Sequence, residues 1–348
     1  MWEDFSFRSR FQPSTLGFVG MHICLVENGL LPVSAYGGTE RVVWYLAAQL
    51  HQLGHRVTLL CRPGSSCPFA RVLPLDAQLP LVAQIPTDCD IAHLHFPSNE
   101  QLPIPSLITN HGNRNSREPF PLNTVFLSKN HASRYGSETF VHNGLDWDDY
   151  GPFQPEVPAR RYAHFLGNAA WRVKNVQGAI AVARKAQTRL KVLGGRRLNL
   201  KMGFRFTLDP RVHFCGMVGG ARKLELLRNS SALLFPVRWH EPFGLAVIES
   251  MYFGCPVFAT PYGALPELVD EGSGTLSSSA DELAYSLKHS LRFSRGYCHE
   301  RARELFHARR MTMNYLGLYE RVLNGESLNS RNPVLQTVQE EKFLPWNQ

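Results

Sequence analysis

The sequence contains no apolar run that approaches the ~20 residues needed to cross a bilayer, so we expect no membrane-spanning helix. Its first twenty residues place Glu3 and Asp4 beside arginines and lack the continuous apolar stretch of a secretory signal. No C-x-x-C pair occurs, and the seven cysteines are scattered along the chain. Such a pattern is typical of a reducing compartment. We therefore expect a cytoplasmic protein whose thiols are free and mostly buried.

The chain also lacks a strong excess of charged residues: 44% of its 348 residues are apolar and 19% are charged, as in a folded globular protein. A chain of 348 residues is too long for one ordinary doubly wound domain and long enough for two.

The net charge of +8 fits nucleic acid, an anionic lipid surface or a phosphorylated substrate. Because the basic residues are dispersed, we expect no nucleic-acid binding. Peripheral association with an anionic membrane at its cytoplasmic face stays open.

Short apolar runs alternate with helical segments along the first half of the chain. Such runs predict buried parallel strands, and the residues between them have helical spacing or form loops. The predicted strands are 21–26, 56–61, 91–95, 106–109 and 124–127, and a helix is predicted over 42–50. The alternation indicates a doubly wound α/β domain over 21–155, with an extension over 1–20 that we expect to be disordered.

The same alternation restarts after a connector rich in Asp, Pro, Gly and Glu, which places a domain boundary near residue 155. A second doubly wound domain is predicted over 156–310. Its predicted strands are 164–167, 190–193, 212–214, 232–235 and 256–259. A helix over 311–325 should pack back toward the first domain, and the tail over 326–348 should be loose. Two such Rossmann-like domains face each other across a cleft between the carboxyl ends of their sheets, where we expect the functional site.

The most informative stretch runs from Glu241 to Glu249, with the sequence E-P-F-G-L-A-V-I-E. It leads from a predicted strand into a helix that opens near Gly244. The backbone N–H groups of Phe243, Gly244 and Leu245 can therefore hold a phosphate, while the two carboxylates accept sugar hydroxyls. Either glutamate alone is explained as well by the helix dipole or by solvent exposure. Neither explanation accounts for the two glutamates together, one on each side of a Pro-Phe-Gly turn.

This stretch resembles the E-x7-E signature of the retaining glycosyltransferases with the GT-B fold in glycosyltransferase family four, also called glycosyl transferases group 1. Other stretches resemble the family in the order in which the family shows them, over roughly residues 21 to 325. They are Gly37-Gly-Thr-Glu40, Asp90-Ile-Ala-His-Leu-His95, His111-Gly112, Val141-His-Asn-Gly-Leu-Asp146 and Gly263-Ala-Leu-Pro-Glu267.

The resemblance implies a role for each of these residues. Glu249 would hold the donor ribose, and Glu241 would hold the transferred hexose. Gly37 and Gly38 would face the diphosphate. His111 would lie beside the reacting sugar, whereas a loop histidine taken alone is as well explained by a bond to a backbone carbonyl.

One departure from the family concerns the cations that hold the diphosphate. Asn168 stands where the family has an arginine, so the resemblance assigns the charge to Lys174, with one residue inserted, and to Arg172 as the substitute. We find no set of His and Cys residues at the spacings of a structural zinc site. We therefore expect no metal and no cofactor, only a UDP- or GDP-sugar donor.

Together these features predict a glycosyltransferase that moves a sugar, expected to be a hexose, with retained anomeric configuration. The acceptor, whether a glycan, a lipid-linked sugar or a small molecule, is not defined by the sequence. A dehydrogenase is disfavoured because the first glycine loop lacks G-x-G-x-x-G. Two alternatives stay open: a nucleotide-sugar epimerase of the same architecture, and a non-catalytic protein that binds a nucleotide sugar.

Overall fold

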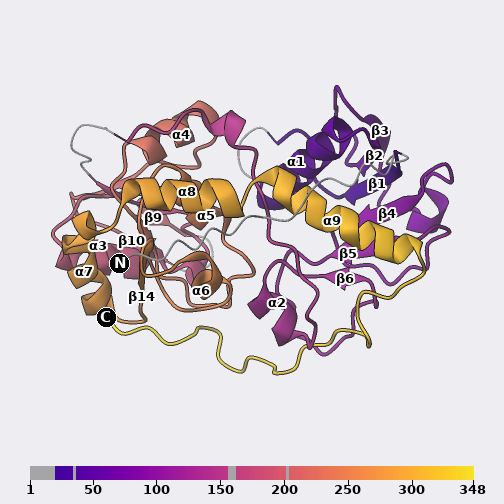
Figure 1. Cartoon of the computed structure of the whole chain (residues 1–348). Coiled ribbons are helices and arrows are strands. Elements are labelled where there is room, and N and C mark those ends of the chain that lie inside the picture. The colour runs from indigo at the N-terminus through magenta and orange to yellow at the C-terminus, as the bar shows by residue number, and fades with distance from the viewer. Residues whose placement is uncertain (1–19, 34–36, 156–161, 201–203) are drawn as a thin grey trace, which may run out of the picture.

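The computed structural model describes residues 20–33, 37–155, 162–200 and 204–348, which form two α/β domains side by side (Figure 1). The expected N-terminal extension lies, except for its last residue, outside this part of the chain. Within the described ranges no helix is both long and apolar enough to span a membrane.

The N-terminal domain is built on a six-stranded parallel sheet with the order β3-β2-β1-β4-β5-β6. The strands are β1 (His22–Glu27), β2 (Arg56–Cys61), β3 (Arg71–Pro74), β4 (Ile91–Leu94), β5 (Ser106–Thr109) and β6 (Thr124–Val125). Every residue of β1 is buried, which explains why the sequence shows a continuous run there instead of alternation. Helices α1 (Gly38–Gln52) and α9 (Ala308–Leu323) cover one face of the sheet, and α2 (Lys129–Arg134) follows β6.

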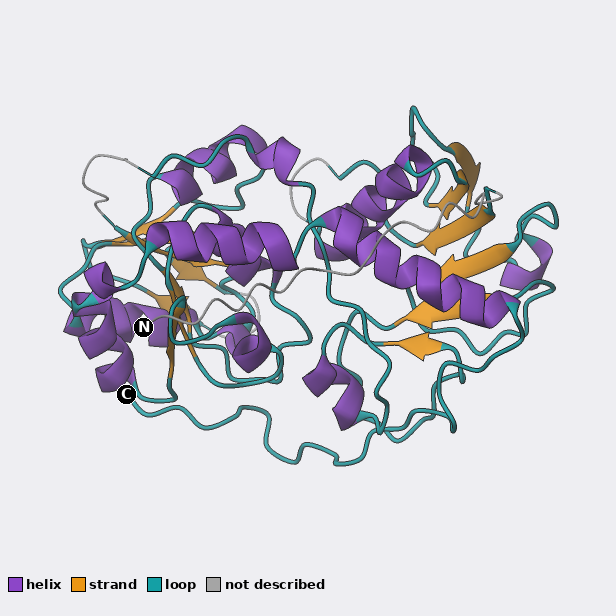
Figure 2. Cartoon of the chain, viewed as in Figure 1, coloured by secondary structure: helices purple, strands orange, loops and turns teal. Residues whose placement is uncertain are grey.

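The C-terminal domain repeats this topology with the order β11-β8-β7-β12-β13-β14. Its strands are β7 (Ala163–Leu166), β8 (Leu190–Leu193), β11 (Val212–Phe214), β12 (Leu233–Phe235), β13 (Val257–Ala259) and β14 (Gly274–Leu276), and β9 (Leu198–Asn199) pairs with β10 (Arg205–Phe206) in a hairpin. Its helices are α3 (Val176–Lys185), α4 (Gly220–Arg228), α5 (Leu245–Tyr252), α6 (Leu265–Leu268), α7 (Ala280–Lys288) and α8 (Arg295–Leu305). Helices lie on both faces of the sheet (Figure 2). The expectation of two doubly wound Rossmann-like domains is confirmed.

Two segments cross between the domains at one point. The chain leaves the N-terminal domain near Leu145 and returns to it near His307, before α9. Leu145 exchanges two backbone hydrogen bonds of 2.9 Å each with residues 306 and 308. A Cβ on Gly144 would lie 2.5 Å from the carbonyl oxygen of His307, so only glycine allows the two segments to touch. The V-x-N-G-L-D stretch of the sequence therefore forms this crossing.

The carboxyl-terminal tail, residues 326–348, departs from the loose segment that we expected. It forms no helix or long strand, but it runs from the N-terminal domain back to the C-terminal domain (yellow in Figure 1). The Asn329 side-chain amide donates to two carbonyls of the N-terminal domain, at 2.7 and 2.9 Å. Further along, the Leu344 N–H donates to the carbonyl of Arg238 at 2.9 Å. Backbone and side-chain hydrogen bonds and buried leucines hold the tail, and none of these leaves a periodic pattern in the sequence.

Candidate active site

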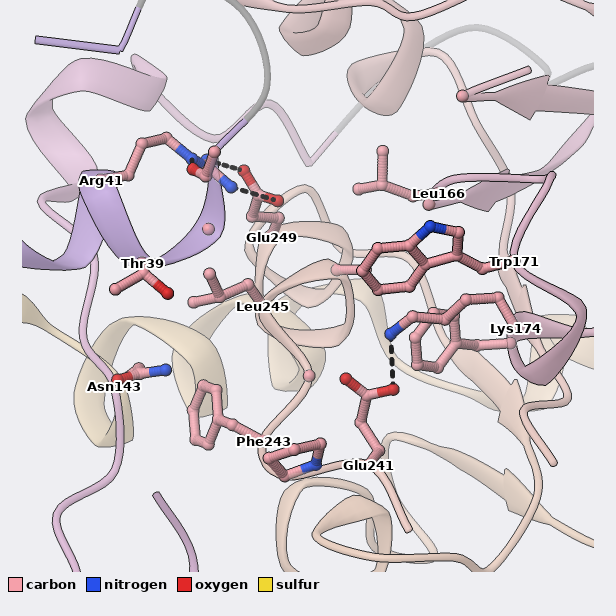
Figure 3. Close-up of a pocket in the computed structure, with 18 of the residues that line it drawn as sticks. Thr39, Arg41, Asn143, Leu166, Trp171, Lys174, Glu241, Phe243, Leu245 and Glu249 are labelled. Carbon is pink, nitrogen blue, oxygen red and sulfur yellow. Dashed lines mark hydrogen bonds and ion pairs between the residues drawn. The ribbon is translucent and has the colours of Figure 1, made fainter. Parts of the chain in front are cut away.

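A cavity of about 390 Å³ opens between the two domains, at the carboxyl ends of both sheets. The N-terminal domain lines it with the start of α1 and the loop after β5. The C-terminal domain lines it with the loop after β7, a side chain of α4 and the segment that leads into α5 (Figure 3). Open α/β sheets bind ligands at this edge, because the loops and helix N-termini that follow parallel strands converge there.

The segment between β12 and α5 turns sharply at Gly244. This residue has φ of 116°, a left-handed conformation that favours glycine, and it directly precedes Leu245, the first residue of α5. The first N–H groups of a helix have no partner within the helix and carry a partial positive charge. The turn therefore presents the start of α5 to the cavity as a site for an anion.

Glu249, on α5, is 2% exposed and lies among three donors. Arg41 and Lys223 donate to its carboxylate at 2.6 and 2.5 Å, and the Tyr150 hydroxyl donates at 2.7 Å. Burial alone would raise the pKa of Glu249, but the charges of Arg41 and Lys223 hold this pKa well below its ordinary range. Glu249 is therefore an anion. Its bond to Arg41 joins α5 to α1 of the other domain (Figure 3), and its bond to Lys223 joins α5 to α4.

Glu241 occupies the other side of the cavity and is 7% exposed. Its Oε2 accepts hydrogen bonds from the Lys174 ammonium and from the Trp239 indole, both at 2.7 Å. Gly263 fixes the backbone here: its φ is 66°, and a Cβ on it would lie 2.2 Å from the Glu241 nitrogen. The G-A-L-P-E stretch thus holds Glu241 through a close backbone approach that only glycine permits.

His111 lines the cavity from the N-terminal domain, directly after β5. Its Nε2 lies 3.0 Å from Nδ1 of His95, which follows the neighbouring strand β4. Burial lowers the pKa of His111 to about 3 and lowers the pKa of His95 well below its usual value. Both imidazoles are therefore neutral at physiological pH, so His111 can exchange a hydrogen bond in the cavity but carries no charge there.

Nine of the ten predicted site residues line this one cavity. They are Gly37, Gly38, His111, Lys174, Glu241, Phe243, Gly244, Leu245 and Glu249. The exception is Arg172, which lines a separate cavity, with its guanidinium carbon 4.9 Å from the centre of the Phe343 ring. Arg172 and Lys174 belong to one 3-10 turn, and residues two apart in such a turn point to different sides. The structure therefore places only Lys174 in the cavity.

Among the polar residues of the cavity that sequence reasoning missed are Arg41, Asn143 and Lys223. Arg41 lies one turn after Gly37 on α1, so the glycine loop itself was the available signal. Asn143 belongs to the interdomain stretch, and its Oδ1 is buried without a hydrogen-bond partner. Lys223 stands on α4 in no motif, and only the fold brings it to Glu249. Arg41 and Lys223 supply positive charge in the cavity that the sequence analysis had assigned to Arg172.

Sequence reasoning also passed over Asp88-Cys89-Asp90, which has the D-x-D spacing of metal-dependent sugar transferases. It precedes β4, and the Asp90 carboxylate accepts the His22 N–H at 2.7 Å at the amino edge of the sheet, away from the cavity. His22, Asp88 and Cys89 bring ligand atoms within 4.8 Å of one another, the only such convergence in the described ranges. Both His22 ring nitrogens already have partners at 2.8 Å, the Asp88 carbonyl and the Thr58 hydroxyl.

Direct bonds join the domains beside the cavity. The Glu267 carboxylate accepts the N–H groups of Lys129 and Asn130, at 2.9 and 2.7 Å, and so satisfies the first turn of α2 from the opposite domain. The Ser128 hydroxyl donates to the Pro242 carbonyl at 2.9 Å, in the turn that precedes α5. These bonds hold the two walls of the cavity against each other.

Two Rossmann-like domains with a cavity between the carboxyl ends of their sheets define the GT-B fold. Residues 160–292, most of the C-terminal domain, match the sequence model of the family described as glycosyl transferases group 1. A D-inositol 3-phosphate glycosyltransferase of Streptomyces avermitilis is 25% identical over 186 aligned residues, which cover 46% of this chain. The chain spans 40% of the length of that relative.

Solved structures resemble most of the chain in fold. AviGT4, a glycosyltransferase involved in avilamycin A biosynthesis, superimposes with a TM-score of 0.71 at 22% identity, over 88% of this chain and 98% of that one. A sucrose-phosphate synthase from Thermosynechococcus elongatus gives a TM-score of 0.67 at 19% identity, over 88% and 100%. HepE from Anabaena, in complex with UDP and glucose, gives 0.60 at 16% identity, over 86% and 99%. The fold and the family match together support a GT-B glycosyltransferase.

Proposed function

We propose that this chain transfers a sugar from a nucleotide-sugar donor to an acceptor, with retention of anomeric configuration and without a metal ion. The observation that carries the proposal is the pair of buried glutamates, Glu241 and Glu249, which meet one cavity from the two sides of the α5 N-terminus. The match to glycosyl transferases group 1 supports the class of reaction. HepE, crystallised with UDP-glucose, supports a nucleotide-sugar donor.

The diphosphate of the donor would lie at the start of α5. The first residues of α5, the N-terminus of α1 at Gly38, and the side chains of Lys174 and Lys223 all line one cavity. Each of these groups stabilises negative charge, and the charge on the diphosphate grows as the glycosidic bond breaks. The protein therefore supplies the stabilisation that a divalent cation provides in other transferases.

The two glutamates would hold the two ends of the donor. Glu249, ionised and near Arg41, would accept hydroxyl groups of the ribose, and Glu241 would accept hydroxyl groups of the transferred sugar. His111 faces them from the N-terminal domain, where the acceptor would approach. Because His111 is neutral, it would act on the reacting sugar by hydrogen bonding and not by charge.

The division of roles is tested by comparing Glu241→Ala with Glu249→Ala. Loss of Glu249 should weaken binding of free UDP or GDP in calorimetry, since its hydroxyl partners lie on the nucleotide. Loss of Glu241 should spare that affinity and lower turnover, since its partners leave with the sugar. Equal losses of nucleotide affinity in both variants would contradict the assignment.

The reaction itself is tested with a thermal-shift panel of UDP-, GDP- and ADP-sugars, followed by turnover of the sugar that stabilises the chain most. A ligand present at one hundred times its dissociation constant adds about 2.7 kcal/mol to the free energy of unfolding. Activity should survive exhaustive EDTA treatment, and NMR should show a product with the anomeric configuration of the donor. Activity restored only by Mg²⁺ or Mn²⁺ would refute the metal-free mechanism. Interconversion of donor sugars would indicate an epimerase, and binding without turnover a non-catalytic protein.

A further inference from the structure

We propose a second ligand site in this chain, an arginine-walled cavity that binds a small molecule carrying phosphate groups. The cavity measures about 360 Å³ and is lined by Arg172, Arg205 and Arg238, together with Phe343 of the carboxyl-terminal tail. Trp171 lines both this cavity and the candidate active site, so the two share a wall. We call it the arginine cavity.

Two of the arginines are arranged around one aromatic ring. The guanidinium carbons of Arg172 and Arg238 lie 4.9 and 5.2 Å from the centre of the Phe343 ring. Stacking on an aromatic ring limits the rotation of a guanidinium and leaves its N–H edges free for a ligand. Arg238 also donates from Nε to the Leu344 carbonyl at 2.7 Å, which fixes the side chain at its stem. The tail therefore builds one wall and orients both cations.

The third arginine is buried. Arg205 is 7% exposed, lies over the Phe214 ring at 4.8 Å, and donates to two neutral acceptors, the Arg196 carbonyl and the Thr207 hydroxyl. Burial lowers its pKa, and no aspartate or glutamate occurs among the described residues that line the cavity. A buried cation without a counter-ion is costly. An anionic ligand would offset that cost.

The charge and size of the cavity indicate the class of ligand. Guanidinium groups bind phosphate through paired N–H bonds, and three of them in one cavity fit a phosphate group better than a single carboxylate. A volume of about 360 Å³ is that of a site for a small metabolite. Phe204, which is 74% exposed, and Phe343 add apolar surface for the rest of the molecule.

The experiment is calorimetry on the full chain at low ionic strength, with inorganic pyrophosphate and a hexose 6-phosphate as probes and the neutral hexose as the blank. Arg172→Gln and Arg238→Gln should each weaken probe binding by about tenfold or more, as expected for the loss of a charge-assisted contact. Arg172 is exposed, so Arg172→Gln should keep the melting temperature of the wild type. Tighter binding of the hexose phosphate would show that the apolar wall takes part.

Two further variants locate the binding. Arg189→Gln removes an exposed arginine outside both cavities and should change nothing. Lys223→Gln removes a cation of the candidate active site and should leave this binding event in place. Binding that is lost in Lys223→Gln and kept in Arg172→Gln would overturn the proposal, as would the absence of phosphate-dependent binding to the wild type. Neither result depends on glycosyl transfer, so the outcome is separate from that of the proposed function.

Discussion

Replacing Glu249 by glutamine should destabilise the folded chain strongly, although the side chain keeps its shape. The substitution removes the negative charge that faces Arg41 and Lys223, whose side chains are 21% and 12% exposed. Breaking a buried ion pair by removing one partner costs about 3–5 kcal/mol, because the other charge stays buried without compensation. Here two cations lose their partner, so we expect a loss in the upper half of that range.

The assay is urea unfolding followed by circular dichroism, with Glu225→Gln as the matched control. Glu225 pairs with Arg222 on the exposed side of α4, at 57% and 61% exposure, and such solvent-screened pairs contribute little to stability. The double variant Glu249→Gln with Lys223→Met should lose less stability than the sum of its parts, since it removes one uncompensated cation. A loss for Glu249→Gln no larger than that of the control, or strict additivity in the double variant, would refute the electrostatic account.

The Glu249 carboxylate should also make the stability of the fold depend on pH. The pKa of Glu249 is lower in the folded state than its ordinary value of 4.5, so its carboxylate stabilises the fold fully above that pH. The stabilisation is lost as the pH falls through the lowered folded-state pKa. Wild type should therefore lose more stability than Glu249→Gln on acidification below about pH 4.5, measured by the same urea titrations.

Three further predictions follow from other parts of the structure. Burial lowers the pKa of His111 to about 3, so folding excludes a proton that the unfolded chain binds below about pH 6.5. As the pH is lowered below about 6.5, the free energy of unfolding should therefore decrease in the wild type. In His111→Gln this decrease should be smaller by up to about 1.4 kcal/mol per pH unit, and equal slopes would contradict burial as the cause. Gly263→Ala should cost at least about 2 kcal/mol and lower turnover, because the new Cβ meets the Glu241 backbone. Gly54→Ala, with φ of 88° and nothing within 4 Å, should show the backbone strain alone, and equal losses would remove the steric argument. Glu267→Ala removes the acceptor for the first turn of α2 and should cost about 1 kcal/mol. Small-angle scattering should then show a larger radius of gyration, and an unchanged radius would mean that this contact does not hold the domains together.

Most of the strands that could be predicted from the sequence are largely buried. The inner strands β2, β5 and β8 begin and end at the predicted residues, and so does the edge strand β11, of which only Val212 is buried. The edge strands β3 and β14 were missed; both are short, and β3 has no buried residue. An apolar pattern in the sequence reflects burial, so a strand without buried residues leaves little trace in it.

Some residues of the candidate site could be predicted from the sequence, and others are brought to it only by the fold. Glu241, Gly244 and Glu249 lie on one continuous segment, so their spacing is visible in the sequence. Lys223 reaches Glu249 only because α4 and α5 contribute to one hydrophobic core, and no local pattern records that contact. Arg172 was assigned to the diphosphate on charge alone, but the short turn that carries it sets its direction.

The carboxyl-terminal tail limits how far the two domains can rotate apart. Gln339 is held on the N-terminal domain by two hydrogen bonds with Asn115, at 2.9 and 3.0 Å, and Leu344 is held on the C-terminal domain by two with Arg238, at 2.9 and 2.7 Å. The five residue steps between these anchors reach at most about 18 Å when fully extended. The tail passes along the lower edge of Figure 1, away from the crossing at Leu145 and His307. The domains can therefore rotate about that crossing only until the tail is taut, and wider opening must first break an anchor.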